Sequence, residues 1–279
     1  MSETAVLYDH PGPRALRRAR LASVVGAVVV LAVVAGVFAR FYQRGHFDGV
    51  KWEPFSDPDT WRAIGDGLVN TLRAAALAIV LSMVTGVLLA VGRLSDRRVL
   101  RLPAVTVVEF FRAVPLLMLI FFFFLASPNT LGSYGALVAG LTLYNGAVIA
   151  EIFRAGILAV PAGQREAAHA IGLRPSQTMS LVLVPQAVRS MLPALISQTV
   201  VVLKDTSLGY IVVYPELVRI GRQIYDNFFN IIPSIIVVTV IYVSMNMLLS
   251  WVAHRLERRT RRQYGKAVLS ADVDTGAAV

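Results

Sequence analysis

Six long apolar stretches divide this sequence, and few charged residues interrupt them. They cover residues 21–39, 67–92, 103–126, 136–160, 187–203 and 231–251. About 20 apolar residues in an α-helix cross the roughly 30 Å hydrocarbon core of a bilayer. No segment between the stretches is long enough to bury a hydrophobic core of its own. The sequence therefore predicts an all-α membrane protein with six transmembrane helices.

The composition supports a membrane protein and excludes several other classes. Hydrophobic residues make up 56% of the chain and charged residues 16%, with a net charge of +10. The basic residues lie between the apolar runs without interleaved aromatic residues, so we expect no nucleic-acid partner. The sequence has no cysteine, and its four histidines are far apart. We therefore expect no disulfide, no metal site and no cofactor.

The basic residues also indicate the orientation of the chain in the membrane. They are concentrated in residues 1–20, 93–101 and 154–189 and in the tail after 254, whereas the alternate segments contain fewer. Lysine and arginine are enriched in cytoplasmic loops of membrane proteins. We expect a multi-pass protein of the plasma (cytoplasmic) membrane, with both termini and the segment 161–185 in the cytoplasm.

The first apolar run has two interpretations. A basic segment precedes residues 21–39, as in a signal peptide, and Val37-Phe38-Ala39 is compatible with a cleavage site. However, the run is longer than the roughly 7 to 15 apolar residues of a signal peptide. We therefore expect a retained transmembrane helix.

Glu109 and Arg112 lie within the third apolar stretch. Residues three apart share one face of a helix, so the two side chains can neutralise each other. Two alternatives remain open for their position. Either the pair lies in the membrane, or the span begins near Pro115 and the pair lies at the interface.

Other polar side chains within or beside the spans are candidates for a substrate pathway. Polar groups in a membrane bundle more often bond to neighbouring helices, and that alternative also remains open. A cluster at 204–207 is expected at the outer side of the bundle, where irregular backbone lines a cavity. The candidate pathway residues are Arg73, Glu109, Arg112, Asn145, Glu151, Lys204, Asp205, Thr206 and Ser207.

Recognised catalytic motifs are missing from the sequence. It contains no Gly-rich phosphate-binding loop, HExxH, GxSxG or paired-cysteine motif. An intramembrane enzyme is therefore disfavoured, and energy for transport would come from a partner or from coupled ions. Ion-coupled carriers usually contain inverted repeats, which are not evident here. An ion-coupled carrier or channel remains the alternative to a partner-driven transporter.

One polar stretch, residues 163–185, separates the fourth and fifth spans. We expect two short helices joined by a turn, with Glu166 in the first turn of the first helix. A carboxylate there is stabilised by the helix dipole by about 0.3–1 kcal/mol. Gly172 suits a C-terminal cap, and Pro175 prevents the first helix from continuing. The second helix is expected to begin at Pro175 or Ser176 and to run toward Pro185.

The stretch resembles the EAA loop of the membrane subunits of bacterial ABC importers. The resemblance comes from Glu166-Ala167-Ala168, followed at the family's spacing by Gly172 and Pro185. The residues before Pro185 are Val-Leu-Val, where the family pattern has Ile-x-Leu. Residues 70–81, 108–117, 150–168 and 203–212 are similar to the polar amino acid subfamily, so the likeness covers about residues 65–255. Residues 6–14 and the extra first helix are similar to glutamate-importer permeases.

This resemblance implies a fold and a set of partners. The fold is an extra N-terminal helix plus a five-helix type I ABC importer permease core. The implied partners are an ABC ATPase dimer, a second permease that is identical or homologous, and an extracytoplasmic amino acid binding protein. Glutamate is the favoured substrate. The implied division of the chain is a tail, extra helix and connector at 1–64, a transport domain at 65–256 with its coupling loop at 161–185, and a basic tail at 257–279.

The resemblance also assigns roles within the coupling loop. Its helix is expected to insert into a groove on the ATPase, with Gly172 providing the bend. Glu166 is expected to contact the ATPase or to hold the shape of the loop. The implied coupling residues are Gly163, Glu166, Ala167, Ala168, Gly172, Arg174 and Pro185.

Overall fold

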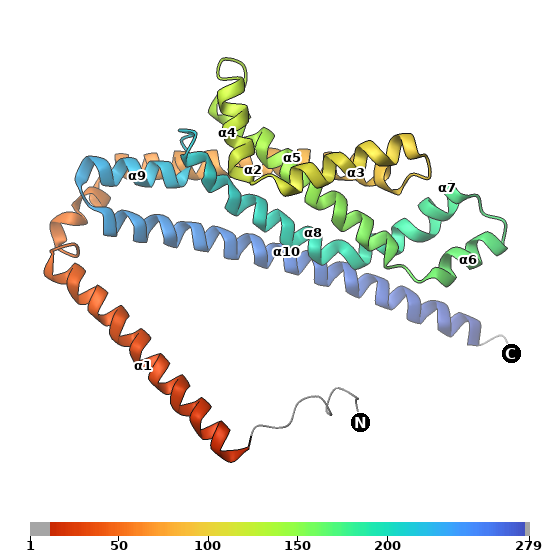
Figure 1. Ribbon diagram of the computed structural model, residues 1–279, viewed down its shortest axis with the longest axis horizontal. Coiled ribbons are helices and arrows are strands. Elements are labelled where there is room, and N and C mark those ends of the chain that lie inside the picture. Colours follow the sequence, from red (N-terminus) through yellow and green to blue (C-terminus); the bar gives the residue numbers. More distant parts are fainter. Residues whose placement is uncertain (1–11, 277–279) are drawn as a thin grey trace.

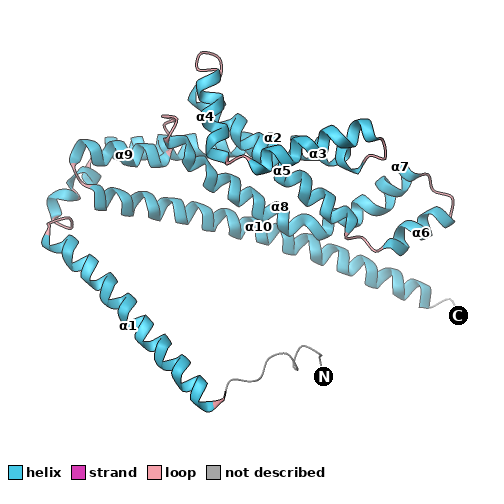
Figure 2. Cartoon of the chain, in the orientation of Figure 1, coloured by secondary structure: helices cyan, strands magenta, loops and turns pink. Residues whose placement is uncertain are grey.

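A computed structural model describes residues 12–276, and it describes side chains for residues 12–252 and 255. Residues 1–11 and 277–279, which belong to the expected terminal tails, lie outside this range. The described residues form helices joined by short loops, without a β-strand (Figures 1 and 2). The longer helices are α1 (Pro13–Gln43), α2 (Pro58–Leu94), α3 (Arg98–Ala113), α4 (Leu116–Ala126), α5 (Gly132–Leu158), α6 (Ala162–Ala170), α8 (Val184–Asp205), α9 (Leu217–Phe228) and α10 (Ile231–Gly276). The short elements are η2 (Gly49–Lys51), η3 (Glu53–Ser56), α7 (Pro175–Gln177), the π-helical η4 (Thr178–Leu183) and η5 (Thr206–Tyr210).

The predicted spans correspond to long apolar helices, with one important difference. Within the described residues, 5 helices are long and apolar enough to cross a membrane, or 6 if the bent pair α3 and α4 counts as one span. The chain bends by 100° between these two helices. Pro115 has no N–H group and disfavours helical geometry at Val114, whose ψ is 129°. The third apolar stretch is therefore broken at Pro115, and Glu109 and Arg112 belong to α3.

The closest packing in the bundle is between α2 and α5. Small residues on both helices bring their backbones together, as is common in membrane bundles. A Cβ atom added to Gly86 of α2 would lie 2.8 Å from the Cβ of Ile149 and 3.1 Å from the carbonyl oxygen of Gly146, both on α5. Around this pair, α3 and α4 pack on α5, α8 packs on α5 and α10, and α9 packs on α2 and α10.

The two ends of this bundle carry different elements (Figure 1). The short helices α6 and α7 mark one end, called here the α6 end, and α9 reaches the other, called here the α9 end. The helix α1 diverges from the bundle and has no buried residue. The connector between α1 and α2 is nevertheless attached to the α9 end. The Lys51 ammonium donates to the carbonyl oxygen of Phe229 at 2.9 Å, and the Asn230 amide donates to that of Lys51 at 3.1 Å.

The helix α2 begins earlier than the apolar pattern indicated. We expected the span to start at Gly67, whereas α2 starts at Pro58. Proline is favoured in the first turn of a helix, and the side chain of Asp57 accepts a hydrogen bond from the Asp59 N–H at 2.9 Å. The first turns of α2 are therefore helical although their residues are polar.

The helix of the fifth span is interrupted just beyond the predicted span, 187–203. The helix α8 ends at Asp205, η5 follows, and the chain then turns through Val213, with φ at 61°, before α9 begins. The Leu217 N–H donates to the Thr71 hydroxyl at 3.0 Å. In the segment 204–207, Thr206 is buried against α10, whereas Lys204 is exposed. The expected position of this segment at the outer side of the bundle stays a prediction.

The C-terminal segment continues the last span. The helix α10 runs without a break from the last apolar span through Gly276 and includes most of the predicted basic tail. The guanidinium of Arg255 lies 4.7 Å from the centre of the Trp251 ring, a cation–π contact near the α6 end.

The packing of α2 on α5 generates a testable prediction. In the Gly86→Ala variant the new methyl group must displace the branched Cβ of Ile149, and overpacking of this kind costs about 1–3 kcal/mol. Gly65→Ala is the matched control, because a Cβ at Gly65 meets nothing within 4 Å. Thermal unfolding of the purified protein in detergent should show a lower midpoint for Gly86→Ala only. Equal midpoints for the two variants would contradict the close approach of α2 and α5.

Candidate functional site

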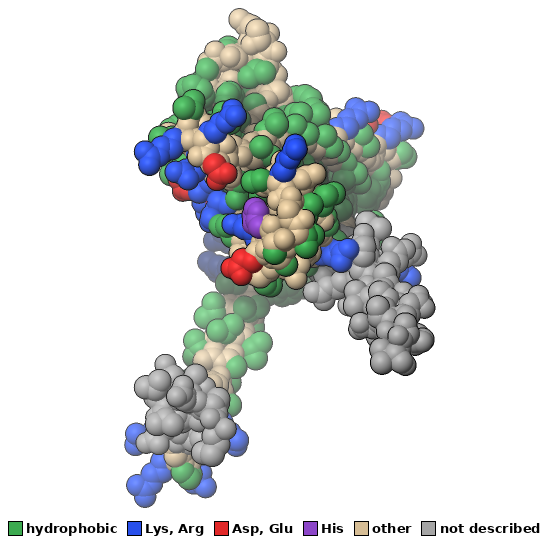
Figure 3. Space-filling view, turned by 90° about the vertical axis from the view of Figure 1, so that its right-hand side faces the viewer, with side chains coloured by type: hydrophobic (Ala, Val, Ile, Leu, Met, Phe, Trp, Pro, Cys, Tyr) green, Lys and Arg blue, Asp and Glu red, His purple; other side chains and the backbone are tan. Residues whose placement is uncertain are grey.

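The α6 end carries an exposed helical hairpin that contains the predicted coupling residues. All residues of α6 are exposed except Ala168, which is 3% exposed and lies on the side that packs against η4. The Gln186 amide donates to the Gln164 side-chain oxygen at 3.1 Å and joins α6 to the start of α8. In the view onto this end, Lys and Arg side chains are spread among hydrophobic ones (Figure 3). The hairpin is therefore a folded, accessible surface.

Gly172 ends α6 as the sequence predicted. Its φ is +82°, a conformation that favours glycine. The Gly172 N–H donates to the carbonyl oxygen of His169 at 3.0 Å, and the Leu173 N–H donates to that of Ala168 at 3.1 Å. These two bonds form a Schellman motif, which satisfies carbonyl groups at the helix end and reverses the chain.

One detail of the expected helix is wrong. The helix α6 begins at Ala162, so Glu166 lies beyond the first turn and no acidic residue occupies that turn. Interaction with the helix dipole falls off within the first turn, and the expected dipole stabilisation of Glu166 is therefore not available. Glu166 is exposed on α6, so its side chain is accessible to a partner.

The second arm of the hairpin merges into the next span. The helix α7 begins at Pro175, as predicted, and the Arg174 N–H donates to the Gln177 side-chain oxygen at 2.9 Å. The π-helical η4 follows, and α8 continues from Val184 through Pro185. Pro185 has no N–H to donate to the preceding turn, and that turn, η4, is π-helical. Pro185 therefore lies in the first turn of α8 instead of ending a separate helix.

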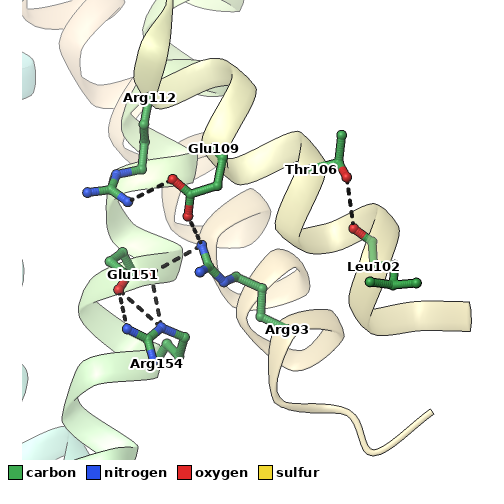
Figure 4. Close-up of polar contacts among 7 residues, drawn as sticks. All are labelled: Arg93, Leu102, Thr106, Glu109, Arg112, Glu151 and Arg154. Carbon is green, nitrogen blue, oxygen red and sulfur yellow. Dashed lines mark hydrogen bonds and ion pairs between the residues drawn. The ribbon is translucent and has the colours of Figure 1, made fainter. Parts of the chain in front are cut away.

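A second group of candidate residues forms an ion-pair network near the α6 end (Figure 4). It joins Arg93 of α2, Glu109 and Arg112 of α3, and Glu151 and Arg154 of α5. The Arg93 guanidinium lies 3.1 Å from a Glu109 oxygen and 3.2 Å from a Glu151 oxygen. The predicted Glu109–Arg112 pair is present at 3.6 Å. The network therefore fastens three helices together.

Arg93 is the central residue of this network, and it was not among the predicted site residues. Its side chain is only 10% exposed, whereas the Glu109 side chain is 55% exposed. From the sequence, Arg93 was interpreted as a basic loop residue. The helical pattern could have indicated the position of Arg93, because α2 continues to Leu94 and Arg93 belongs to its last turn. Its partners, however, come from distant parts of the chain.

The remaining polar candidates lie apart from this network. The buried Asn145 amide donates to the carbonyl oxygen of Leu141 at 3.0 Å, and its side-chain oxygen accepts from Gln198 at 2.7 Å. This bond joins α5 to α8 inside the bundle. Arg73 is exposed on α2. The structure therefore brings Glu109, Arg112 and Glu151 together but leaves Asn145 and Arg73 at separate positions.

The cluster from Lys204 to Ser207 lies where α8 passes into η5. Thr206 is buried, and its hydroxyl donates to the carbonyl oxygen of Leu203 at 2.6 Å and lies 3.2 Å from the Tyr242 hydroxyl of α10. Lys204 is exposed beside α10, whereas Asp205 and Ser207 are partly buried. The cluster therefore faces α10 at the interruption of the fifth span.

Glu216 is a second residue that the sequence interpretation missed. It is fully buried, and its carboxylate accepts hydrogen bonds from the N–H groups of Val218 at 2.8 Å and Arg219 at 2.6 Å. These bonds satisfy the first N–H groups of α9. A glutamate directly before an amphipathic segment is a helix-start signal, but no helix was predicted between the apolar stretches 187–203 and 231–251.

Comparison with known proteins identifies the family of the chain. Residues 71–262 match the family described as binding-protein-dependent transport system inner membrane component. The chain belongs to this family. This inner membrane component is therefore a permease component of a transport system and a multi-pass protein of the plasma membrane. Its family membership replaces the alternative of a self-contained ion-coupled carrier.

Curated relatives of this inner membrane component are permeases of amino acid transport systems. It is 43% identical over 225 residues to the glutamate transport system permease protein GluD of Corynebacterium glutamicum, covering 78% of this chain and 82% of that protein. It is 36% identical over 201 residues to the probable glutamine ABC transporter permease protein GlnP of Bacillus subtilis, covering 70% of this chain and 92% of that protein.

Solved structures support the same fold. The crystal structure of an amino acid ABC transporter with histidines matches 74% of this inner membrane component and 97% of its own chain, with a TM-score of 0.69 and 28% identity. An inward-facing structure of the MetNI methionine ABC transporter matches with a TM-score of 0.64 and 23% identity, covering 73% of this chain and 98% of that chain. The expected fold class, an all-α ABC importer permease, is confirmed.

The ion-pair network generates a second prediction. Arg93→Met removes the cation that links Glu109 to Glu151, although Arg112 and Arg154 still pair with these glutamates, and the loss of hydrogen bonds to charged groups costs about 1.5–3 kcal/mol. Arg98→Met is the control, because Arg98 is exposed at the start of α3 and its replacement should change stability by less than about 0.5 kcal/mol. Unfolding in detergent measures both variants. A stability for Arg93→Met equal to that of Arg98→Met would show that the network does not hold the three helices.

Proposed function

We propose that this chain is the translocation subunit of an ATP-binding-cassette importer for a polar amino acid, with glutamate favoured. Translocation proceeds by alternating access, and a separate ATPase supplies the energy. The observation that carries the proposal is the 43% identity to a glutamate transport system permease over most of both chains. The exposed hairpin at the α6 end supports it, because it presents a surface to which an ATPase can bind.

The hairpin is built to transmit force into the bundle. The helix α6 follows α5 after a short link, and Gly172 returns the chain toward η4 and α8. Movement of α6 therefore acts on α5 and α8, which cross the bundle and pack on each other. The coupling residues of the proposal are Gly163, Glu166, Ala167, Ala168, Gly172, Arg174 and Pro185.

The proposal includes the partners and the orientation of the chain. The α6 end faces the cytoplasm with both termini, and an ABC ATPase dimer binds there. A second permease, identical or homologous, completes the pathway, and an extracytoplasmic binding protein delivers the amino acid at the α9 end. The concentration of basic residues at 93–101, 154–189 and 255–266 supports this orientation. Residues 65–256 form the transport domain, between the segment 1–64 and the basic tail at 257–279.

Polar residues of the bundle are proposed to line or shape the pathway. Two groups support this role by their position, namely the network around Glu109, Arg112 and Glu151 and the cluster at 204–207. Arg73 supplies a further cation, and Asn145 holds α5 to α8. An anionic substrate such as glutamate fits the excess of cations over carboxylates in the network.

Uptake by a reconstituted transporter tests the proposed function. The chain is placed in liposomes with the ATPase, the second permease and the binding protein, and labelled glutamate is added outside. Uptake should require ATP at the cytoplasmic face, and ion gradients alone should support none. Competition by unlabelled glutamine, aspartate and arginine then ranks the substrates. Glutamate uptake driven by an ion gradient without the ATPase would reject the proposal.

Substitutions in the hairpin test the coupling role. Gly172→Pro cannot adopt the φ of +82° and removes the N–H bonded to His169, while Glu166→Lys reverses an exposed charge on α6. Both variants should insert into the membrane normally and lose ATP-driven uptake almost completely. Asp96→Lys, an equal charge reversal in the exposed α2–α3 loop, serves as the control and should retain uptake. Normal uptake by Gly172→Pro or Glu166→Lys would exclude the hairpin from coupling.

A further inference from the structure

Three cavities follow one another along one side of α10. The first, of about 300 Å³, lies between α9 and α10 and is lined by Tyr210, Arg222 and Thr239. The second, of about 350 Å³, is lined by Lys204, Thr239 and Asn246. The third, of about 430 Å³, is also lined by Lys204 and Asn246. Because consecutive cavities share lining residues, they form one continuous furrow, called here the α10 furrow.

The α10 furrow is long enough to cross most of a membrane. Its lining on α10 extends from Ser234 in the first cavity to Ser250 in the third. At 1.5 Å per residue these residues are about 24 Å apart along the helix. The hydrocarbon core of a bilayer is about 30 Å thick. The furrow therefore reaches from near the α9 end, past the interruption of the fifth span, toward the α6 end.

Both charged side chains that line the furrow are cationic. Arg222 lies in the first cavity, with its guanidinium 5.6 Å from the centre of the Tyr210 ring and 3.5 Å from the Asp226 carboxylate, which is not part of the lining. Lys204 lies deeper, in the second and third cavities. Within the described side chains, Lys204 has no carboxylate at ion-pair distance. The furrow therefore offers two positive charges at different depths.

The opposite side of α10 has a different character. There a groove of about 660 Å³ between α2 and α10 is lined almost entirely by apolar side chains such as Leu72, Ile79 and Leu248. Such a surface suits lipid. A lysine at membrane depth is costly when it faces lipid, and it normally faces a partner or a water-filled path. The groove side of α10 therefore suits contact with lipid, whereas the side that carries the furrow and Lys204 needs water or another protein.

We propose that the α10 furrow is one part of the translocation path that this chain contributes, and that Arg222 and Lys204 bind the carboxylates of an acidic amino acid in succession. The amino acid first meets Arg222 near the α9 end and then Lys204 beside the interruption of the fifth span. A guanidinium and an ammonium both form charge-assisted hydrogen bonds with carboxylates. The inference rests on the proposed import of an acidic amino acid and specifies where it passes.

Labelling of single cysteines tests whether the furrow contains water. The chain has no cysteine of its own, so each introduced thiol is the only one in this subunit. Thr239→Cys places a thiol in the furrow, and Ser244→Cys places one in the apolar groove; both positions are exposed hydroxyl residues of α10. A charged, water-soluble thiol reagent should modify Thr239→Cys at least about ten-fold faster, because a thiol in apolar surroundings rarely ionises. Saturating glutamate and binding protein should slow this reaction.

Charge-removing and charge-retaining substitutions test the two cations. In the reconstituted importer, Lys204→Gln and Arg222→Gln should each lower the maximal rate of glutamate import about ten-fold or more, the loss of a charge-assisted contact. Lys204→Arg and Arg222→Lys should retain most of the rate, which separates a charge effect from misfolding. Arg62→Gln is the matched control, because Arg62, like Arg222, is exposed and paired with one carboxylate, that of Asp59.

The outcomes separate this inference from the proposed function. Absence of ATP-dependent glutamate import by the unmodified protein would reject the proposed function itself. If the unmodified protein imports glutamate, equal labelling of Thr239→Cys and Ser244→Cys would overturn the furrow as a water-filled path. Normal import by Lys204→Gln and Arg222→Gln would overturn their role as carboxylate-binding residues.

Discussion

The lack of water in a bilayer is the constraint on which this structure depends. Backbone N–H and C=O groups in lipid must bond within the protein, so a span can be interrupted only where other helices cover it. The interruption between α8 and α9 meets this condition. The Leu217 N–H bonds to the Thr71 hydroxyl, the Tyr214 hydroxyl bonds to the Asn70 carbonyl oxygen, and Glu216 caps α9. An irregular segment can therefore lie inside the bundle beside the cations of the α10 furrow.

The α6 end combines an accessible surface with a fastened base. The helices α6 and α7 are exposed almost throughout, whereas the ion pairs of Arg93 hold α2, α3 and α5 together. Under the proposed coupling role, a force applied to α6 would reach three helices that ion pairs join.

Much of the fold could be predicted from the sequence because hydrophobic length and backbone chemistry are local properties. The apolar runs located the spans, Gly172 marked the end of α6, and Pro175 marked the start of α7. The spacing of Glu166, Gly172 and Pro185 identified the family, which the comparison of residues 71–262 confirmed. Two errors in the prediction also concerned where individual helices begin. Polar residues concealed the start of α2 at Pro58, and the position of Glu166 within α6 was misjudged.

The sequence by itself determined the membrane class, the helical spans and the hairpin of α6 and α7, because each depends on the properties of neighbouring residues. Only the tertiary structure decided that Arg93 pairs with Glu109 and Glu151, that Thr206 is buried against Tyr242 of α10, and that one groove beside α10 contains Lys204 and Arg222 whereas another is almost entirely apolar. These features depend on which helices pack together and in which rotation. Apolar residues surround most of a membrane helix, so the hydrophobic pattern does not indicate which side faces lipid.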